Sequence, residues 1–241
     1  MNKTILAPLA AAVLCMNAGA KEFYGDVDHP VTPIMFSLAD PIQLPQSNWK
    51  VYGLRLNVFC ANSFSVRGLD LGLVGITPSD MTGLALSAAS WVDADFTGVQ
   101  LGALGNVVRG YGTGIQFATV VNYNQSTFTG VQSGLVNYNG VFRGLQLGLF
   151  NWDCGECYGL ELGAVNFNDS ELHGWEVGAM NIGNRLYGVQ IGAVNVIQGK
   201  GRGFQLGVFN AATEFQGVQI GLLNIIGTGA VPILPVVNAN F

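Results

Sequence analysis

One short motif recurs along most of this chain, and it constrains the fold more than any other feature. The segments 188–195 and 217–224 are nearly identical copies of it, each running Gly, apolar, Gln, apolar, Gly, two apolar residues and Asn. A fixed period of this kind is typical of proteins in which every repeat forms one structural unit. Taking the first glycine as position 0, the units begin at Gly53, Gly68, Gly83, Gly98, Gly114, Gly130, Gly144, Gly159, Gly174, Gly188, Gly203 and Gly217, at spacings of 14 to 16 residues.

The first half of each unit alternates between apolar and polar residues. Positions 1 and 3 are apolar almost throughout, as in Leu145 and Leu147, whereas position 2 is nearly always polar, as in Gln146. A period of two predicts a β-strand with two different faces. We expect positions 1 and 3 to face an apolar core, and position 2 to face away from it, toward solvent or a polar lumen.

The second part of the motif breaks this alternation. Positions 5 and 6 are both apolar, which indicates a bend or bulge beside the glycine at position 4. From Gly130 onward, position 7 is Asn in every unit. Repeated Asn either forms a hydrogen-bonded ladder between stacked units or ends each strand separately as a turn residue, and the sequence leaves both alternatives open.

The charged residues are few and unevenly placed. They make up 10% of the chain, against 49% hydrophobic residues and 34 glycines, a composition typical of neither a disordered chain nor an ordinary α/β enzyme. Apart from position 2, the charges of the units lie in their second halves, which predicts a solvated edge there. An apolar residue, such as Phe128 or Leu186, usually precedes the next glycine by two and is expected to re-enter the core.

Repeats of this length fit two all-β architectures. In a β-solenoid of about twelve 15-residue coils with terminal caps, each unit forms one coil. In a closed antiparallel barrel of the outer-membrane type, each unit forms one strand and one turn. A spanning barrel strand needs about 9 to 11 residues, and the strict alternation here is shorter, which favours the solenoid. The terminal Phe241, preceded by alternating apolar residues, is typical of such barrels and keeps that alternative open.

The two ends of the chain differ from the repeats. Lys3, the apolar run 5–16 and the small residues 18–20 predict a signal peptide at 1–20. The segment 21–52 is expected to cap the repeat domain at 53–230, and 231–241 to form a C-terminal cap or a terminal strand. No later stretch is long enough for an apolar helix that spans a membrane. An exported protein of the cell surface or outer membrane is therefore expected.

The repeats resemble those of a family of exported bacterial surface-repeat proteins. The resemblance rests on 51–57, on units such as 144–151 and on the Pro-containing end with Phe241, and it covers about 52–241. It implies a surface or outer-membrane location and no established activity. Gly75 and Ser90 depart from the pattern at the Asn position, so an unbroken Asn ladder is not expected in the first units.

Two pairs of carboxylates are candidate cation ligands. Asp80 and Asp95 both occupy position 12 of adjacent units, and so do Glu156 and Glu171. If the units stack in register as coils, the members of a pair lie about 5 Å apart. Calcium, which prefers carboxylate and carbonyl oxygens, is the expected guest, bound weakly by few ligands; side chains that simply extend into water are the alternative.

The other reactive residues do not form a recognisable catalytic site. Cys154 and Cys157 have the spacing of a thiol-redox motif but lie in the edge loop of a repeat, so a local disulfide or two free thiols are expected. Cys60 stands at an Asn position and is expected to be a small buried residue. His29 and His173 are the only histidines, and no nucleophile or phosphate-binding motif is present. We expect no enzyme, cofactor or small-molecule substrate, and the net charge of −5 argues against a nucleic-acid partner. The partner is then a surface ligand or the outer membrane.

Overall fold

The protein is a β-solenoid of about 13 turns, with 83% of the described residues in strands. The computed structural model describes residues 28–241, and these contain no helix. The predicted solenoid is therefore confirmed, and the closed antiparallel barrel is wrong. The predicted signal peptide at 1–20 lies outside the described residues.

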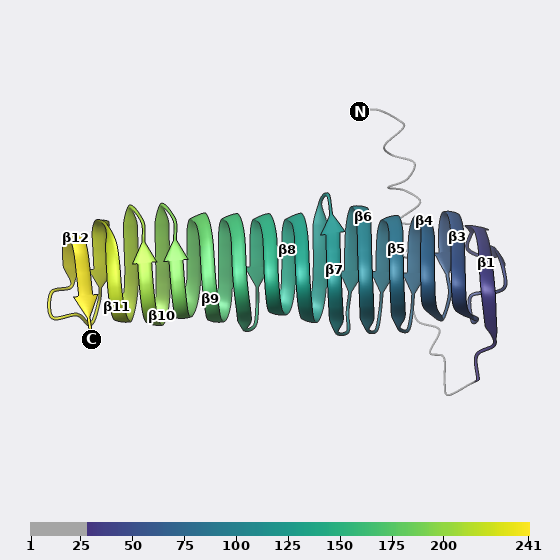
Figure 1. Cartoon of the computed structure of the whole chain (residues 1–241), viewed down its shortest axis with the longest axis horizontal. Coiled ribbons are helices and arrows are strands. Elements are labelled where there is room, and N and C mark those ends of the chain that lie inside the picture. The colour runs from purple at the N-terminus through teal and green to yellow at the C-terminus, as the bar shows by residue number, and fades with distance from the viewer. Residues whose placement is uncertain (1–27) are drawn as a thin grey trace, which may run out of the picture. The chain divides into compact units, whose positions relative to one another are not determined.

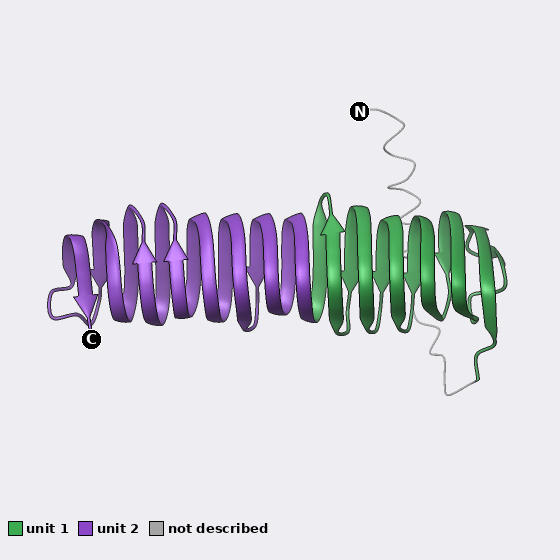
Figure 2. Cartoon of the chain, in the orientation of Figure 1, with its two compact units in different colours: residues 1–126 green, residues 127–241 purple. Residues whose placement is uncertain are grey.

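The chain divides into two compact units, Met1–Ser126 and Thr127–Phe241 (Figure 2). Figure 1 shows the successive coils side by side within each unit. Several strands continue through the corners of the coils, so that β8 and β9 each extend over more than one turn. The strands are β1 (Val31–Ala39), β2 (Ile42–Leu44), β3 (Lys50–Asn62), β4 (Ser65–Thr77), β5 (Met81–Val92), β6 (Phe96–Val108), β7 (Gly112–Ala118), β8 (Val121–Asp153), β9 (Cys157–Ile191), β10 (Val194–Leu206), β11 (Phe209–Ile226) and β12 (Ile233–Asn240).

Equivalent positions of neighbouring coils pair with one another in parallel. In the first unit Gly68 pairs with Gly53 and with Gly83, and the register of β3 on β4 shifts once, between Asn57 and Cys60. In the second unit Gly203 pairs with Gly188 and Gly217 in the same way. Parallel pairing of successive units is what a solenoid requires, whereas an up-and-down barrel pairs neighbours antiparallel.

The glycine at position 0 is required by both backbone conformation and space. All twelve of the glycines that start the units have positive φ, between 130° and 153°. A Cβ added at Gly159 would lie 1.9 Å from the carbonyl oxygen of Gly144 in the preceding coil. A side chain cannot be accommodated at that distance, and residues with a Cβ rarely adopt this φ. These two constraints explain why glycine marks the start of each unit.

The two faces of the strand are the reverse of those predicted. Gln146 at position 2 is fully buried, whereas Leu145 and Leu147 lie on the outer side and are only partly buried. The alternation showed that two faces exist but not which one is inside. The interior admits amide side chains because the same position recurs in every coil at about the 4.8 Å strand spacing, where amides can hydrogen-bond to each other.

An apolar core does exist, but it follows a different position. The residue two before each starting glycine points inward, as predicted for Phe96, Phe128, Phe142, Leu172, Leu186 and Phe215, all of which are buried. In the first unit this row includes Val51, Val66 and Met81. In the second unit it joins Ile197 and Ile226 in one buried cluster. Apolar rows and amide rows therefore share the interior of the coils.

Different strand arrangements end the two units. In the first, β1 stacks in parallel on β3, and the short β2 pairs antiparallel with β1. In the second, β12 pairs antiparallel with β11. Each arrangement covers the open edge of the coil beside it, which would otherwise offer unpaired backbone groups to another chain.

Candidate functional site

Seven Asn side chains of the second unit form a continuous hydrogen-bonded ladder in the interior. In each of the first six, Nδ2 donates to Oδ1 of the Asn in the next coil at 2.7–2.9 Å, and the ladder runs through Asn137, Asn151, Asn166, Asn181, Asn195, Asn210 and Asn224. Most of them also donate to a backbone carbonyl, as Asn181 does to Ile191. The ladder was one of the two predicted alternatives and is confirmed. In the first unit Asn106 and Asn122 form one rung of the same kind.

A second ladder runs along position 2 and was not predicted. Gln219 Nε2 donates to Gln205 Oε1 at 2.7 Å, and Gln205 Nε2 donates to Gln190 Oε1 at 2.6 Å. The amide of Gln205 thus donates toward the preceding coil and accepts from the following one. The recurrence of the same residue was the available indication, because a solvent-facing position would vary among polar residues whereas a ladder needs complementary amides.

Charged residues interrupt this row in the first unit, where they neutralise each other. The Arg55 guanidinium donates from Nε and Nη2 to the two carboxylate oxygens of Asp70, at 2.8 and 2.7 Å. Its remaining donors reach Ser63 Oγ, Ile76 O and Thr77 Oγ1. Both side chains are completely buried. The bidentate geometry and the additional hydrogen bonds satisfy the charges that burial would otherwise penalise.

Charged residues also interrupt the row in the second unit, but there they are all acidic. Glu161 and Glu176 occupy position 2 of successive coils, and Asp153 and Cys157 lie beside them in the interior; we call these four residues the interior acidic cluster. All four are completely buried. Asp153, Cys157 and Glu161 each offer one ligand atom, and these atoms lie within 4.8 Å of one another. Asp153 was predicted to lie on the solvated edge, and that placement is wrong.

The hydrogen-bond donors around the cluster are amides and one thiol. Cys157 Sγ donates to Glu161 Oε1 at 2.9 Å, and Asn168 Nδ2 donates to Glu161 Oε2 at 3.0 Å. Asn168 Nδ2 and Gln190 Nε2 donate to the two oxygens of Glu176. Asn139 Nδ2 donates to Asp153 Oδ1 at 2.8 Å. None of these donors carries the positive charge that neutralises Asp70 in the first unit.

Burial without a counter-charge raises the pKa of every titrating group in the cluster. Loss of solvation raises the pKa of Glu176 from 4.5 to about 7. It also raises the pKa of Asp153, and that of Glu161 well above its ordinary value, with the Asp153 carboxylate adding to the effect on Glu161. The pKa of the Cys157 thiol is raised well above 9.0 by burial and by the nearby carboxylates. The cluster therefore favours bound protons, or another positive species, over free carboxylates.

The predicted calcium ligands have other partners in the turns. Asp80 Oδ1 accepts a hydrogen bond from the backbone N–H of Asp95 at 3.3 Å, and Asp95 Oδ1 accepts one from Tyr111 N at 2.7 Å. The structure thus brings Asp80 and Asp95 together, with each carboxylate bonded to the backbone of the next coil. Such bonds give these carboxylates a structural role in the turns.

The second predicted pair is held by neighbouring side chains. Glu156 accepts a hydrogen bond from Tyr158 Oη at 3.0 Å. Glu171 lies 3.8 Å from Arg185 and 3.6 Å from His173. Among residues 28–241, the one group of three or more potential metal ligands is the interior trio of Asp153, Cys157 and Glu161, to which none of the four predicted ligands belongs.

The cysteines and histidines occupy structural positions. Cys154 and Cys157 are free thiols; Cys154 is half-buried with Sγ 3.1 Å from Tyr138 Oη, whereas Cys157 points inward. Cys60 is buried, as predicted. His173 stacks between Tyr158 and Tyr187 on the outer side, with ring centroids 4.8 and 4.9 Å apart.

His29 lies near the start of the first unit. Its ring stacks on Phe64 at 3.6 Å, and its Nδ1 lies 2.8 Å from Asn48 O. These contacts hold the ring within the first coils and give it a structural role.

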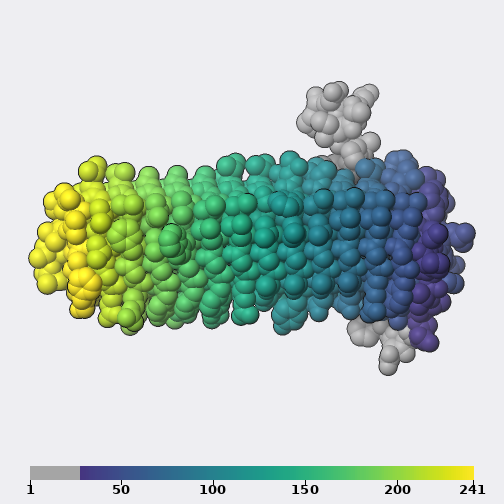
Figure 3. Space-filling model, in the orientation of Figure 1, coloured from purple at the N-terminus to yellow at the C-terminus, as the bar shows by residue number. Residues whose placement is uncertain are grey.

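Apolar side chains form rows on the outer surface of the coils. Positions 1, 3, 5 and 6 carry no charged residue in any unit, and nearly all of these residues are apolar. In the second unit Phe150 is 52% exposed and Leu222 is 74% exposed, and in the first unit Phe59 and Phe117 are also exposed. Figure 3 shows the side chains of successive coils aligned in rows within each unit. The outer surface formed by these four positions is thus apolar, whereas the surface of a soluble protein is usually polar.

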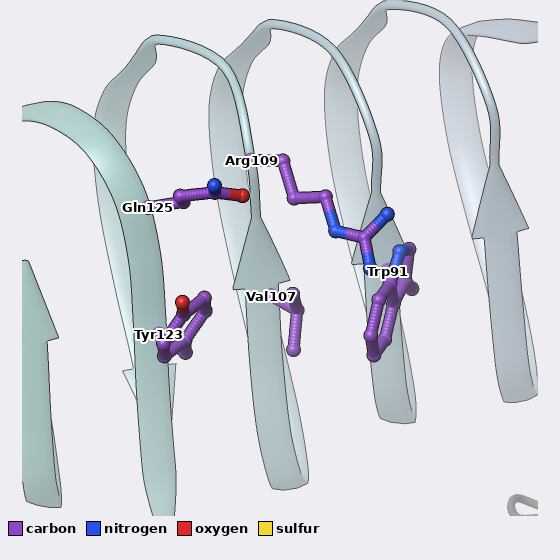
Figure 4. Close-up of a pocket in the computed structure, with 5 residues that line it drawn as sticks. All are labelled: Trp91, Val107, Arg109, Tyr123 and Gln125. Carbon is purple, nitrogen blue, oxygen red and sulfur yellow. The ribbon is translucent and has the colours of Figure 1, made fainter. Parts of the chain in front are cut away.

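A shallow pocket of about 550 Å³ interrupts the outer surface of the first unit (Figure 4). It lies where the small Val107 stands between the rings of Trp91 and Tyr123, with Arg109 and Gln125 above. The Arg109 guanidinium lies 4.8 Å from the Trp91 ring and 2.9 Å from Asp93, so its charge is already compensated. The pocket extends the apolar outer surface and presents no catalytic group.

Comparison with known proteins gives no relative for this chain. No protein-family model, no curated protein and no solved structure matches it. Among the described residues, no helix is present that is long and apolar enough to cross a membrane.

Proposed function

We propose that this chain is a non-enzymatic, exported surface-repeat protein with a structural or binding role, and that its partner is a lipid surface. The observation that carries the proposal is the reversed distribution of residues, with amide ladders inside the coils and charge-free apolar rows outside. Large contiguous apolar patches are rare on soluble monomers and mark surfaces that contact a membrane or another protein.

The distribution of charge favours lipid as the partner. Around each coil, the apolar positions 1, 3, 5 and 6 follow one another, and the outward charges lie in the second half of the unit, as do Asp95, Arg185 and Lys200. The cross-section is therefore amphipathic, the arrangement by which a protein lies in a membrane interface with its charged side in water.

The backbone is also suited to contact with lipid. The N–H and C=O groups of each coil pair with those of the neighbouring coils within each unit. A lipid-facing chain needs this internal satisfaction because acyl chains offer no hydrogen bonds. Most interior amide side chains of the second unit find hydrogen-bond partners in the ladders.

Flotation with neutral phosphatidylcholine vesicles tests the proposal. We expect the wild-type chain to float with the vesicles, and the triple variant Leu149→Glu, Val208→Glu, Leu222→Glu to remain largely in solution. These three positions are exposed, so the variant should fold, with the circular dichroism of the wild type. Three carboxylates on the lipid-facing side would each oppose burial in the membrane.

The matched control is Thr129→Glu, Gln198→Glu, Gln216→Glu, which adds the same charge at exposed polar positions outside the apolar rows. We expect this variant to float as the wild type does. Equal loss of vesicle binding in both variants would mean that the added net charge, and not the apolar rows, determines binding. A wild-type chain that stays in solution, alone or as a dimer, without binding vesicles would overturn the lipid proposal. Fractionation of cells that express the full chain tests export separately.

A further inference from the structure

The interior acidic cluster contains one point at which the Gln ladder fails. Farther along the second unit, Gln205 donates toward the preceding coil and accepts from the following one. Gln146 keeps this orientation, since its Nε2 donates to Gln132 Oε1 at 3.3 Å. Its Oε1 should then accept from the next coil, but Glu161 stands there and a carboxylate has no N–H to donate. Gln146 Oε1 is consequently buried without a hydrogen-bond partner.

A second oxygen beside the same point is also without a partner. Asp153 Oδ2 is buried and accepts no hydrogen bond, although Oδ1 accepts one from Asn139. Gln146 is close enough to Asp153 for its side chain to act on the pKa of that carboxyl group, so both oxygens lie in one small region of the interior. An unsatisfied buried oxygen is costly, and two of them beside further carboxylates indicate that a positive species is needed between them.

We propose that Asp153, Cys157 and Glu161, with the amide oxygen of Gln146, bind one divalent transition-metal ion of the zinc type inside the coils. The three side chains already bring their ligand atoms within 4.8 Å of one another. Zinc takes thiolate and carboxylate ligands at about 2.0–2.3 Å in a tetrahedron, which needs ligand atoms about 4 Å apart or less. Small movements of the three side chains bring their ligand atoms to bonding distance from the ion, and Gln146 Oε1 supplies the fourth ligand of the tetrahedron.

The presence of a thiol selects the class of metal. Calcium and magnesium take oxygen ligands, whereas a Cys ligand favours zinc and related transition metals. Binding converts the Cys157 thiol to a thiolate and displaces the protons that the Asp153 and Glu161 carboxyls hold in the metal-free protein, and all of these protons leave to solvent. The hydrogen bond from Cys157 to Glu161 is then replaced by two bonds to the ion, and Asn168 still donates to Glu161 Oε2. The fully enclosed position implies that the ion enters as the coils assemble.

Refolding with and without metal tests the proposal. The full chain is unfolded in guanidinium with a chelator, freed of both, and refolded with no metal, with Zn²⁺ or with Co²⁺. We expect about one equivalent of metal per chain after gel filtration and a higher thermal midpoint than in the metal-free protein. The Co²⁺ form should show a near-ultraviolet thiolate-to-metal charge-transfer band, which oxygen ligands alone do not give.

Cys157→Ser and Asp153→Asn should each lose the bound equivalent, and Cys157→Ser should also lose the charge-transfer band. Cys154→Ser is the matched control, because Cys154 lies three residues away and points to Tyr138, and it should keep both. Metal bound equally well by wild type and Cys157→Ser would place the ion elsewhere and overturn the proposal. A wild-type chain that refolds fully and binds no metal, with an unchanged thermal midpoint, would overturn it without any variant.

Discussion

The interiors of the two units treat buried charge in opposite ways at the same position of the repeat. In the first unit Arg55 and Asp70, both at position 2, form a bidentate pair with further hydrogen bonds to the guanidinium. In the second unit Glu161 and Glu176 occupy position 2 with Asp153 alongside, and their donors are neutral. The positive and negative charges of the first arrangement cancel, whereas the negative charges of the second need bound protons or a metal ion to neutralise them.

This difference shows that the amide interior accepts charge only when the charge is compensated locally. Both sites are completely buried, so solvent cannot screen either of them. In the second unit burial raises the pKa values of the interior carboxyls, because no positively charged side chain of the described residues lies beside them. The oxygens of Gln146 and Asp153 that lack a hydrogen-bond partner mark the place where a positive species would bind. The two sites can therefore be perturbed in parallel to test the comparison.

The largest effect is expected from Arg55→Met. It leaves Asp70 buried with only Asn57 Nδ2 as a charge-stabilising donor, at 3.1 Å. Breaking a buried pair from one side costs about 3–5 kcal/mol, and we expect a loss of that size in the free energy of unfolding measured with denaturant. The double variant Arg55→Met, Asp70→Leu should recover part of it, because no unpaired charge remains. A single variant that loses less than about 1 kcal/mol would contradict the role given to the pair.

The repeat register could be predicted from the sequence, because the geometry at position 0 admits only glycine. The twelve glycines identified by spacing are the twelve with positive φ. The inward orientation of Phe128 and Leu186 could also be predicted, because an apolar side chain that follows a charged turn is more stable buried in the interior than exposed to solvent.

The choice of faces was wrong because it assumed that the apolar face is always the inner one. An alternating pattern shows that a strand has two different faces but not which of them points inward. Only the repetition of Gln at position 2 indicated that these side chains hydrogen-bond to one another from coil to coil in the interior. The interior acidic cluster could not be predicted from spacing alone. Asp153 and Glu161 come from different coils and from different positions of the repeat, and they meet only because both positions point inward.

The next largest effect is expected from pH in the metal-free protein. The folded state holds the Glu176 proton more tightly than the unfolded state, with a pKa of about 7 against 4.5. This contribution to stability is therefore complete below about pH 4.5 and is lost as the pH rises through 7. The shift corresponds to about 3 kcal/mol. Denaturation with chelator present should show stability falling between pH 5 and pH 8 by roughly this order.

Glu176→Gln isolates this contribution, because it introduces glutamine, which the following coil carries at position 2 as Gln190. Between pH 5 and pH 8 the free energy of unfolding of the variant should fall less than that of the wild type, and the difference should equal about the contribution of Glu176. An equally steep fall in the variant would mean that Glu176 is not the titrating group, and that Asp153 and Glu161 carry the dependence.

A smaller effect, of opposite sign in the two units, is expected from neutralising one carboxylate. Asp70→Asn removes the negative charge but keeps Oδ1 as an acceptor for the guanidinium, so it should destabilise less than Arg55→Met, by about 1–3 kcal/mol. Glu161→Gln supplies the N–H that Gln146 Oε1 lacks and relieves repulsion with Asp153. At pH 8 with chelator it should stabilise the protein by about 1–2 kcal/mol. The same sign for both variants would remove the distinction between a compensated and an uncompensated interior.

The smallest effect is expected from Cys154→Ser, which separates the turn from the interior acidic cluster. Cys154 is half-buried and its Sγ contacts Tyr138 Oη, a hydrogen bond that serine can retain, so stability should change by less than about 0.5 kcal/mol. In the folded wild type, alkylation should modify Cys154 first and reach Cys60 and Cys157 only on unfolding, because these two are buried. A disulfide between Cys154 and Cys157 would instead leave Cys60 as the one reactive thiol among the cysteines of residues 28–241 in the unfolded chain, and it would make Cys154→Ser destabilising. Since Cys157 then could not bind a metal, the thiol count in the unfolded protein also decides whether the cluster is free to take up an ion.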